Sequence, residues 1–458
     1  MSNDKPRRSI FGGLLFVLVG SILLAGSFYP EIRFWSFFAR FWPAILILWG
    51  LAKLFDYFAS QRSGNPQPPA FTAGEFFLLF FLIVLGVGVA GVRDWFNRGD
   101  VGPFQGDWPP GLFSHYTYRE ETSLKVAKPD VLINIQNARG DVNVVPWDTS
   151  EIRVVTQKDV LVFGNEADGR ERAAQVRIEI REVTGGYEIR RVDTGIAGNR
   201  GRVSLDLEIH IPRQAAIEAK VQRGNLTLGG FAGNVTVDGQ RSEVEVRDIQ
   251  KDVDIRLDRG SIRISKVKGN VRLTGSGSEL EIGDVGGEAA LTAVEFTGPI
   301  RLTNIAKGGR FQSQRSDLSF GPLPGRLELD SGDLQIVDSA GSVDITTREK
   351  DIRLENIAGR VRIQNRRGNI ELRYKTPPKD ELDVVNESGN IEVTLPSAAT
   401  FEISASSDKG EVESEFEGPG LKKSDEKESA RLEGKVGTKG PQIRVKTTYG
   451  TVSLRKTT

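Results

Sequence analysis

The feature that most constrains the fold is a repeat that runs from residue 224 to residue 372. Cut every nine residues, part of it reads GNLTLGGFA, GNVTVDGQR, SEVEVRDIQ, KDVDIRLDR, GSIRISKVK, GNVRLTGSG and SELEIGDVG. Each unit carries an apolar–polar–apolar triplet, as in Val244–Glu245–Val246. Such short alternation predicts a half-buried strand, and the Gly-rich gaps predict turns. Repetition at a fixed step predicts a stacked array of strands.

The true period is twice nine, because alternate units differ near their ends. Every second unit has an apolar residue two positions before the next unit, namely Phe231, Ile249, Val267, Val285 and, further on, Ile305, Leu323 and Ile357. The units between them have Gln240, Asp258 and Ser276 at that place. Two kinds of strand therefore alternate along the chain.

The outward residue of each triplet gives an independent test of the period. Stacking at nine residues would place Glu245 on Asp254 and Arg263 on Arg272, and like charges on neighbouring strands destabilise a sheet. Stacking at eighteen gives two alternating columns: Glu245–Arg263–Glu281 and Asp254–Arg272, with Arg353 over Glu371 and Asp344 over Arg362 later. The sequence therefore predicts an all-β fold, a β-solenoid with two short strands and two turns per coil of about eighteen residues.

The repeat is irregular in three places. Residues 288–321 contain longer steps, which predict a bulged coil or a surface loop, and the step recovers from Arg326. After Thr376–Pro377–Pro378 the coils lengthen to roughly twenty-one residues, and the charged segment 418–440 predicts a mobile loop. The strands expected at 442–447 and 450–454 would form the C-terminal cap. We expect the solenoid to occupy 216–458.

The segments before the repeat predict a linker and a cap. Residues 97–120 are rich in Gly, Pro and aromatic residues and are expected to be a linker. Residues 121–215 alternate like strands without the nine-residue step. Because an open solenoid end exposes a sheet edge, we expect this segment to be an N-terminal β layer that covers the first coil.

The first 96 residues predict an α-helical transmembrane region. Three apolar segments, at about 10–28, 34–58 and 76–94, are long enough to span a bilayer. A cleaved signal peptide is the alternative for the first segment, but two further apolar segments follow it closely. Lys5, Arg7 and Arg8 favour a cytoplasmic N-terminus. Three crossings would then place the β domain on the extracytoplasmic side of the cytoplasmic membrane, and two crossings would place it in the cytoplasm.

Composition and motifs give no chemical site. The 61 basic and 61 acidic residues balance, so charge offers no case for nucleic acid. Without Cys, thiol catalysis, thiolate metal sites and disulfides are excluded. Of the two His, His210 is expected to be a partly buried sheet residue and His115 a solvated linker residue. No phosphate loop or calcium-repeat motif is present. We therefore predict no catalytic, cofactor-binding or metal-binding residue and no cofactor.

Two families resemble parts of this chain. Gly12–Gly13–Leu14–Leu15, Gly20 and the run Phe41–Gly50 (FWPAILILWG) resemble the paired-helix membrane module of LiaI/LiaF-type bacterial envelope-stress proteins. Val145–Asp148 (VPWD), Leu207–Pro212 (LEIHIP) and the recurrent Gly-Asn/Ser/Asp units resemble the bacterial “putative adhesin” family of unknown function, a β-solenoid domain related to YvlB. The resemblance implies a membrane-tethered envelope protein and brings no catalytic residues.

The sequence favours a membrane-anchored, non-enzymatic β-solenoid envelope protein that acts by binding or presentation, adhesin-like or in envelope-stress signalling. Its partners would be the lipid bilayer and an envelope protein or polysaccharide, and the oligomeric state is left open. One alternative is a self-assembling scaffold like the bactofilins. The other is a carbohydrate-active β-helix enzyme, since carboxylates are plentiful.

Overall fold

The computed structural model describes residues 114–162, 165–194, 202–425 and 427–457. The three apolar segments of the N-terminal region therefore lie outside the described residues. None of the described helices is long and apolar enough to cross a membrane. Two compact units make up the chain. Among the described residues the first comprises 114–119, 157–162, 165–177, 192–194 and 202–204, and the second comprises 120–156, 178–191, 205–425 and 427–457.

The first unit contains the short helix α4 (Glu166–Ala174). Asn165 caps its N-terminus: the Asn165 side chain accepts from the Asp168 N–H at 3.2 Å, and the Asp168 carboxylate accepts from the Asn165 N–H. The Lys158 ammonium donates to the Ala173 carbonyl at 3.1 Å, where the last turn leaves acceptors free. These caps explain why a mostly polar segment is helical.

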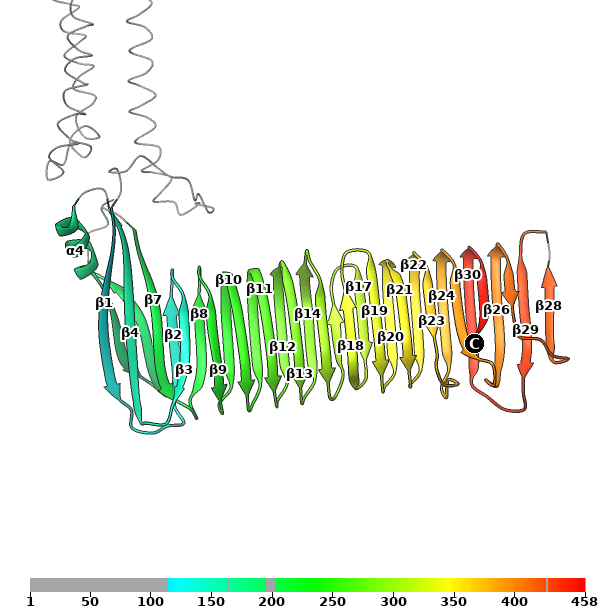
Figure 1. The fold of residues 1–458 in the computed structure, drawn as a ribbon, viewed down its shortest axis with the longest axis horizontal. Helices are drawn as coiled ribbons and strands as arrows, with labels where there is room; N and C mark the ends of the chain where they lie inside the picture. The colour runs from blue at the N-terminus through cyan, green and yellow to red at the C-terminus, as the bar shows by residue number, and fades with distance from the viewer. Residues whose placement is uncertain (1–113, 163–164, 195–201, 426, 458) are drawn as a thin grey trace, which may run out of the picture. The chain divides into compact units, whose positions relative to one another are not determined.

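The second unit is a solenoid with two rows of paired strands (Figure 1). The first row runs in spatial order through β6 (Gly186–Asp193), β2 (Leu132–Asn137), β8 (Ala216–Val221), β10 (Val235–Ile249), β11 (Val253–Val267), β12 (Val271–Gly277), β14 (Ala289–Phe296), β16 (Gly309–Gln312), β17 (Ser316–Phe320), β20 (Val343–Glu349), β22 (Val361–Arg367), β24 (Leu382–Ser388), β30 (Gln442–Tyr449), β26 (Phe401–Lys409), β29 (Ala430–Val436) and β28 (Leu421–Asp425).

The second row contains the other strand of each coil. It runs through β7 (Arg202–Pro212), β3 (Val142–Trp147), β9 (Leu226–Phe231), the second halves of β10 and β11, β13 (Glu279–Val285), β15 (Ile300–Ile305), β18 (Leu323–Leu329), β19 (Asp333–Ser339), β21 (Asp351–Ile357), β23 (Ile370–Arg373), β25 (Ile391–Pro396), β31 (Val452–Thr457) and β27 (Val412–Ser414). The remaining strands are β1 (Ser114–Lys125), β4 (Glu151–Val162) and β5 (Val176–Val183).

The eighteen-residue register is confirmed. Glu245 lies opposite Arg263, and Arg263 lies opposite Glu281. Asp254 lies opposite Arg272 in the other row. The later pairs Arg353–Glu371 and Asp344–Arg362 are also in register. Inward Val, Ile and Leu side chains fill the interior, including all seven apolar markers from Phe231 to Ile357. Burial of these stacked side chains supplies the main stabilisation.

The Asp or Asn residue near the start of many repeat units stabilises the turn of the next coil. The Asp252 carboxylate accepts from the backbone N–H of Asn270 at 2.7 Å, and the Asn270 side chain accepts from that of Glu288 at 3.0 Å. A second ladder joins Asp351 to Asn369 and Asn369 to Asn390. Each side chain thus satisfies a turn amide one coil further on. This explains the Gly-Asn/Asp motif as a turn ladder.

One inward column changes character along the solenoid. At its N-terminal end the column in the first row holds Val221, Gly239, Leu257 and Gly275, and in the C-terminal half it holds Ser316, Thr347, Asn365, Asn386, Thr447 and Ser407. The Asn365 amide donates to the Lys350 carbonyl at 3.0 Å, and Asn386 donates to the Gly368 carbonyl at 2.8 Å. These buried side chains satisfy corner carbonyls that would otherwise lack a partner.

The irregular segment contains a coil wound in reverse. β17 pairs antiparallel with both β16 and β20, and β18 pairs antiparallel with both β15 and β19. The chain therefore turns back at 313–315, completes a coil in the opposite direction, and turns forward again at 330–332. The expectation of a surface loop was wrong here, and so was a recovery from Arg326, which lies in β18. The expected bulge does occur in this segment: where Leu273 and Gly275 of β12 pair with Leu291 and Val294, β14 has one extra residue.

The C-terminal coils are not stacked in chain order. β30 lies between β24 and β26 (Figure 1), and β31 lies between β25 and β27. The strands at 442–457 therefore form an internal coil and are not the C-terminal cap that the sequence suggested. Segment 418–440 is not a loop either: it contains β28 and β29, which extend the first row as antiparallel strands. Alternating residues such as Ala430 and Leu432 are buried there despite the high charge.

Candidate functional site

The reversed coil is the most distinctive position on the solenoid surface. Its two hairpin tips, at 313–315 and 330–332, follow from two short turns. The Ser313 hydroxyl accepts from the backbone N–H of Ser316 at 3.1 Å, and the Asp330 carboxylate accepts from those of Gly332 and Asp333 at 2.8 Å each. We call the surface around these tips the hairpin edge.

Three hollows meet at the hairpin edge. The wide hollow, of about 800 Å³, extends from Arg259 to both tips and has Phe296 and Phe311 on its apolar side. The sheet hollow, of about 600 Å³, lies over the second row of strands from Arg301 to Glu371. The cationic hollow, of about 530 Å³, extends from Arg315 to Tyr449. Arg315, Ser331 and Lys350 line both the wide and the cationic hollow. The break in the repeat thus creates concave surface.

Lys350 anchors one tip from below. Its side chain is 8% exposed, and its ammonium donates to the Asp330 carbonyl. Burial lowers the pKa of Lys350, although the carboxylates of Asp330 and Asp333 oppose this effect. The Asp330 tip is therefore held by a partly desolvated cation.

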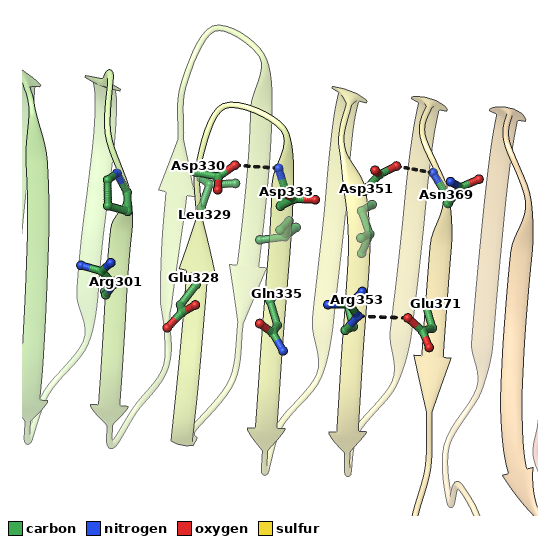
Figure 2. Close-up of a pocket in the computed structure, with 13 residues that line it drawn as sticks. Arg301, Glu328, Leu329, Asp330, Asp333, Gln335, Asp351, Arg353, Asn369 and Glu371 are labelled. Atoms are coloured by element: carbon green, nitrogen blue, oxygen red, sulfur yellow. Dashed lines mark hydrogen bonds and ion pairs between the residues drawn. The ribbon is translucent and has the colours of Figure 1, made fainter. Parts of the chain in front are cut away.

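The carboxylates at this edge are structural acceptors. Hydrogen bonds from the backbone N–H groups of Asp333 and Gly332 lower the pKa of Asp330, together with the nearby Lys350 ammonium and against the effect of burial. Asp351 accepts from the Asn369 backbone in the turn ladder (Figure 2). A general acid needs a raised pKa. The pKa of Asp330 is lowered instead, which argues against acid catalysis by this residue.

A row of polar side chains crosses the sheet hollow. Figure 2 shows Arg301, Glu328, Gln335, Arg353 and Glu371 along one line, one on each successive strand. The Arg353 guanidinium donates to the Glu371 carboxylate at 3.0 Å, which raises the pKa of Arg353. The two Arg and two Glu of this row compensate one another, but Asp330, Asp333 and Asp351 also line the sheet hollow, which therefore carries a net negative charge.

The cationic hollow has the opposite charge balance. Five basic residues line it (Arg315, Arg348, Lys350, Arg366 and Arg367), against Glu349 and Glu387. Both carboxylates are already paired, Glu387 with Arg366 at 3.2 Å and Glu349 with Arg367 at 3.3 Å. Within residues 114–457 as described, no ion pair joins Arg315 or Arg348 to a carboxylate. The hollow therefore carries a net positive charge.

The two histidines lie away from the hairpin edge. His210 is in β7, where its ring nitrogen Nε2 lies 2.9 Å from Glu208 and its ring packs edge-on against Trp147. Its side chain is 23% exposed, as expected for a partly buried sheet residue. His115 is exposed in β1. In the part of the chain that the structure describes, no group of three or more His, Asp or Glu residues could hold a metal ion.

The sequence indicated the irregular segment but not the binding surface at the hairpin edge. It assigned no binding residue, and the residues of the cationic hollow are spread from Arg315 to Tyr449. Their proximity follows from the reversed coil and the inserted terminal coil, which neither spacing nor composition signals. The one available signal was the broken step at 288–321.

Comparisons with known proteins identify two parts of the chain. The LiaI-LiaF-like transmembrane region matches residues 10–54. The Toastrack DUF4097 family matches residues 119–455. Both resemblances inferred from the sequence are thereby confirmed. No curated protein matches the chain.

Three solved structures are similar to this chain. A “putative cell adhesion protein” from Clostridium sporogenes is 11% identical, with a TM-score of 0.16, and the match covers 74% of this chain and 100% of that one. A “putative adhesin” from Bacteroides fragilis is 11% identical, with a TM-score of 0.20 and coverage of 74% and 97%. A “putative lipid binding protein” from Parabacteroides distasonis is 11% identical, with a TM-score of 0.19 and the same coverage.

The Toastrack match includes both tips of the reversed coil and the inserted coil at 442–455. It spans well over half of the 458 residues. The chain therefore belongs to the Toastrack DUF4097 family.

Proposed function

We propose that this chain is a membrane-anchored, non-enzymatic binding protein of the bacterial envelope, and that the hairpin edge is its binding surface. The observation that carries the proposal is the reversed coil. It interrupts the parallel stacking of the coils and brings three hollows together around two hairpin tips. A change that served stacking alone would not need to create concave surface.

The membrane anchor supports this function. The match to a LiaI-LiaF-like transmembrane region at 10–54 favours tethering, and the apolar segments at 10–28, 34–58 and 76–94 would provide three crossings. The division into a linker at 97–120, a β cap at 121–215 and a solenoid at 216–458 remains a proposal, with two differences: β1 already begins at Ser114, and β2, β3, β6 and β7 of the cap segment belong to the two rows of the solenoid. With three crossings the solenoid lies on the extracytoplasmic side, where envelope ligands are available.

The scaffold alternative is less well supported. End-to-end stacking needs open sheet edges, but β28 carries exposed Lys422 and Lys423, and β27 has only three residues. Short or lysine-bearing edges oppose edge-to-edge pairing.

Binding can be tested by co-sedimentation of the full-length protein, reconstituted in lipid nanodiscs, with isolated bacterial cell walls. We expect Ser331→Trp to reduce the bound fraction, because Ser331 lines both the wide and the cationic hollow. The matched control is Ala398→Trp, on an exposed turn that lines none of the three hollows. Equal binding by both variants, or no binding by the wild type, would overturn the proposal.

Sidedness can be tested with single cysteines, since the chain contains none. In spheroplasts, a membrane-impermeant maleimide should label Ala398→Cys and leave Ser63→Cys, between the second and third apolar segments, unlabelled until lysis. Labelling of Ser63→Cys alone would place the solenoid in the cytoplasm.

A further inference from the structure

We propose that the cationic hollow binds an anionic polysaccharide, whose acidic groups contact Arg315 and Arg348 and whose sugar rings lie along the row of residues from Glu349 through Arg367 and Ser388 to Tyr449. This inference rests on the proposed binding function and names the ligand class for one hollow of the hairpin edge.

Charge is the first argument. Arg315 lies on a hairpin tip and Arg348 near the end of β20, and both side chains are exposed. Because the two carboxylates of the hollow are paired with Arg366 and Arg367, the charges of Arg315 and Arg348 are available to an anion. Guanidinium groups present planar pairs of donors that match carboxylate and phosphate oxygens. The buried Lys350 below them adds a third positive charge, although the nearby carboxylates of Asp330 and Asp333 offset part of it.

The aromatic residue is the second argument. Tyr449 is one of the few large apolar side chains that the described solenoid exposes, at 49%. It sits at the far end of the hollow, and Lys409 lies over its ring with Nζ 5.2 Å from the centroid. The ring thus offers an apolar surface beside positive charge. Amphipathic rings at binding sites combine apolar area with polar contacts.

The spacing of the strands is the third argument. Glu349, Arg367, Ser388, Tyr449 and Lys409 occupy one row, each on the next strand of the first row. Neighbouring strands are about 4.8 Å apart, close to the length of one sugar ring in an extended chain. A polymer with a regular repeat can therefore meet a new side chain at each strand. The charge balance of the whole chain, with 61 basic and 61 acidic residues, gives no comparable attraction for nucleic acid.

The test measures binding of the full-length protein in nanodiscs of neutral lipid to four immobilised probes: polygalacturonate, dextran, polyphosphate and single-stranded DNA. We expect binding to polygalacturonate that weakens with salt, and no binding to dextran. Arg315→Glu and Arg348→Glu should each raise the Kd by about tenfold or more, as expected for loss of a charge-assisted hydrogen bond. Lys439→Glu, an equal charge change on an exposed turn outside the hollow, should leave the Kd unchanged.

The sugar component is tested separately by Tyr449→Ala. We expect this variant to weaken polygalacturonate but not polyphosphate, because only the sugar polymer has rings to lie against Tyr449. Equal losses for both probes, or tighter binding to polyphosphate or DNA than to polygalacturonate, would reject a polysaccharide. If cell walls bind in a Ser331-dependent manner while polygalacturonate does not, this inference fails and the proposed function stands. If neither binds, both fail.

Discussion

At the scale of single residues, the solenoid satisfies many of its buried polar groups, but among the described residues the Tyr374 hydroxyl and the side-chain oxygens of Asn365 and Asn386 have no hydrogen-bond partner. Asn365, Asn386, Thr447 and Ser407 each donate to a corner carbonyl. The Tyr374 hydroxyl is buried, and it has no hydrogen-bond partner among the described residues. Burial raises the pKa of Tyr374. An unsatisfied buried hydroxyl costs stability, so this position is suboptimal.

Tyr374→Phe should raise the free energy of unfolding at pH 7 by about 1 kcal/mol, because it removes a buried polar group that has no partner. The pH dependence should change as well. Since the pKa of Tyr374 is raised in the folded state, the neutral hydroxyl favours folding, and this contribution is lost as pH rises above the unfolded value of about 10. Between pH 7 and 11 the free energy of unfolding should therefore fall less in the variant than in the wild type, and denaturant unfolding measures this difference.

Tyr187→Phe is the matched control for this prediction. The Tyr187 side chain is also buried, but its hydroxyl accepts from the Ala127 N–H at 3.3 Å. Removing that acceptor should lower the free energy of unfolding by about 1 kcal/mol. Equal losses in the two variants would show that the Tyr374 hydroxyl has a partner after all.

At the scale of strands and coils, outward charges define the register while inward apolar residues supply the stability. Arg263 lies between Glu245 and Glu281, and its guanidinium donates to Glu281 at 3.0 Å. Such exposed pairs contribute little energy individually. Their arrangement nevertheless excludes a register shifted by one strand, because that shift would align like charges.

Arg263→Glu should lower the midpoint of thermal unfolding at low salt, since the new acid would lie between two others. The effect should shrink at high ionic strength because the charges are exposed and screened. Arg263→Gln, which removes the attraction without adding repulsion, should have a smaller effect. A charge reversal without effect at low salt would contradict the importance of this column.

The sequence could predict the length and register of the coils, but not that one coil is wound in the opposite direction. Paired apolar residues and alternating charges were sufficient for the eighteen-residue register, as Glu245, Arg263 and Glu281 show. Strand alternation reads the same in both directions, so Leu327 and Leu329 fit a forward or a reversed strand equally well. The hairpin edge was therefore not predictable, although the broken step marked its position. The charged segment at 418–440 was wrongly expected to be a loop because it contains few apolar residues, among them the buried Ala430 and Leu432.

At the scale of the whole molecule, the inserted coil of β30 and β31 makes neighbouring coils depend on residues from the end of the chain, unlike a stack in chain order. Ile443 lies between Leu382 and Ile403 in the first row, and Val452 lies between Ile391 and Val412 in the second. All of these strands alternate apolar and polar residues in the same way. The sequence alone could therefore not show which strand lies beside which, and it favoured stacking in chain order. Contacts between coils 382–396 and 401–414 pass through residues 442–457.

A chain that ends at Gly440 should lose more than one coil. Without β30 and β31, β26 loses its parallel neighbour and β27 loses its neighbour β31, so we expect residues 401–436 to become susceptible to proteolysis. Replacing 418–436 by a short Gly-Ser linker removes a similar number of residues from the outer end. That variant should keep 442–457 protected. Mass spectrometry of limited digests distinguishes the two outcomes, and equal protection of 401–416 in both variants would contradict the inserted arrangement.

The inserted coil also links folding to the order of synthesis. Residues 401–436 leave the ribosome before residues 442–457, yet they take their final place outside them. If they fold onto β24 and β25 as soon as they emerge, they occupy the position that the later coil needs and must be displaced. The last step of folding is then a competition between two strands with the same apolar alternation. A chaperone that keeps 401–436 unpaired, or fast translation of the residues that follow, would raise the yield of correctly stacked protein.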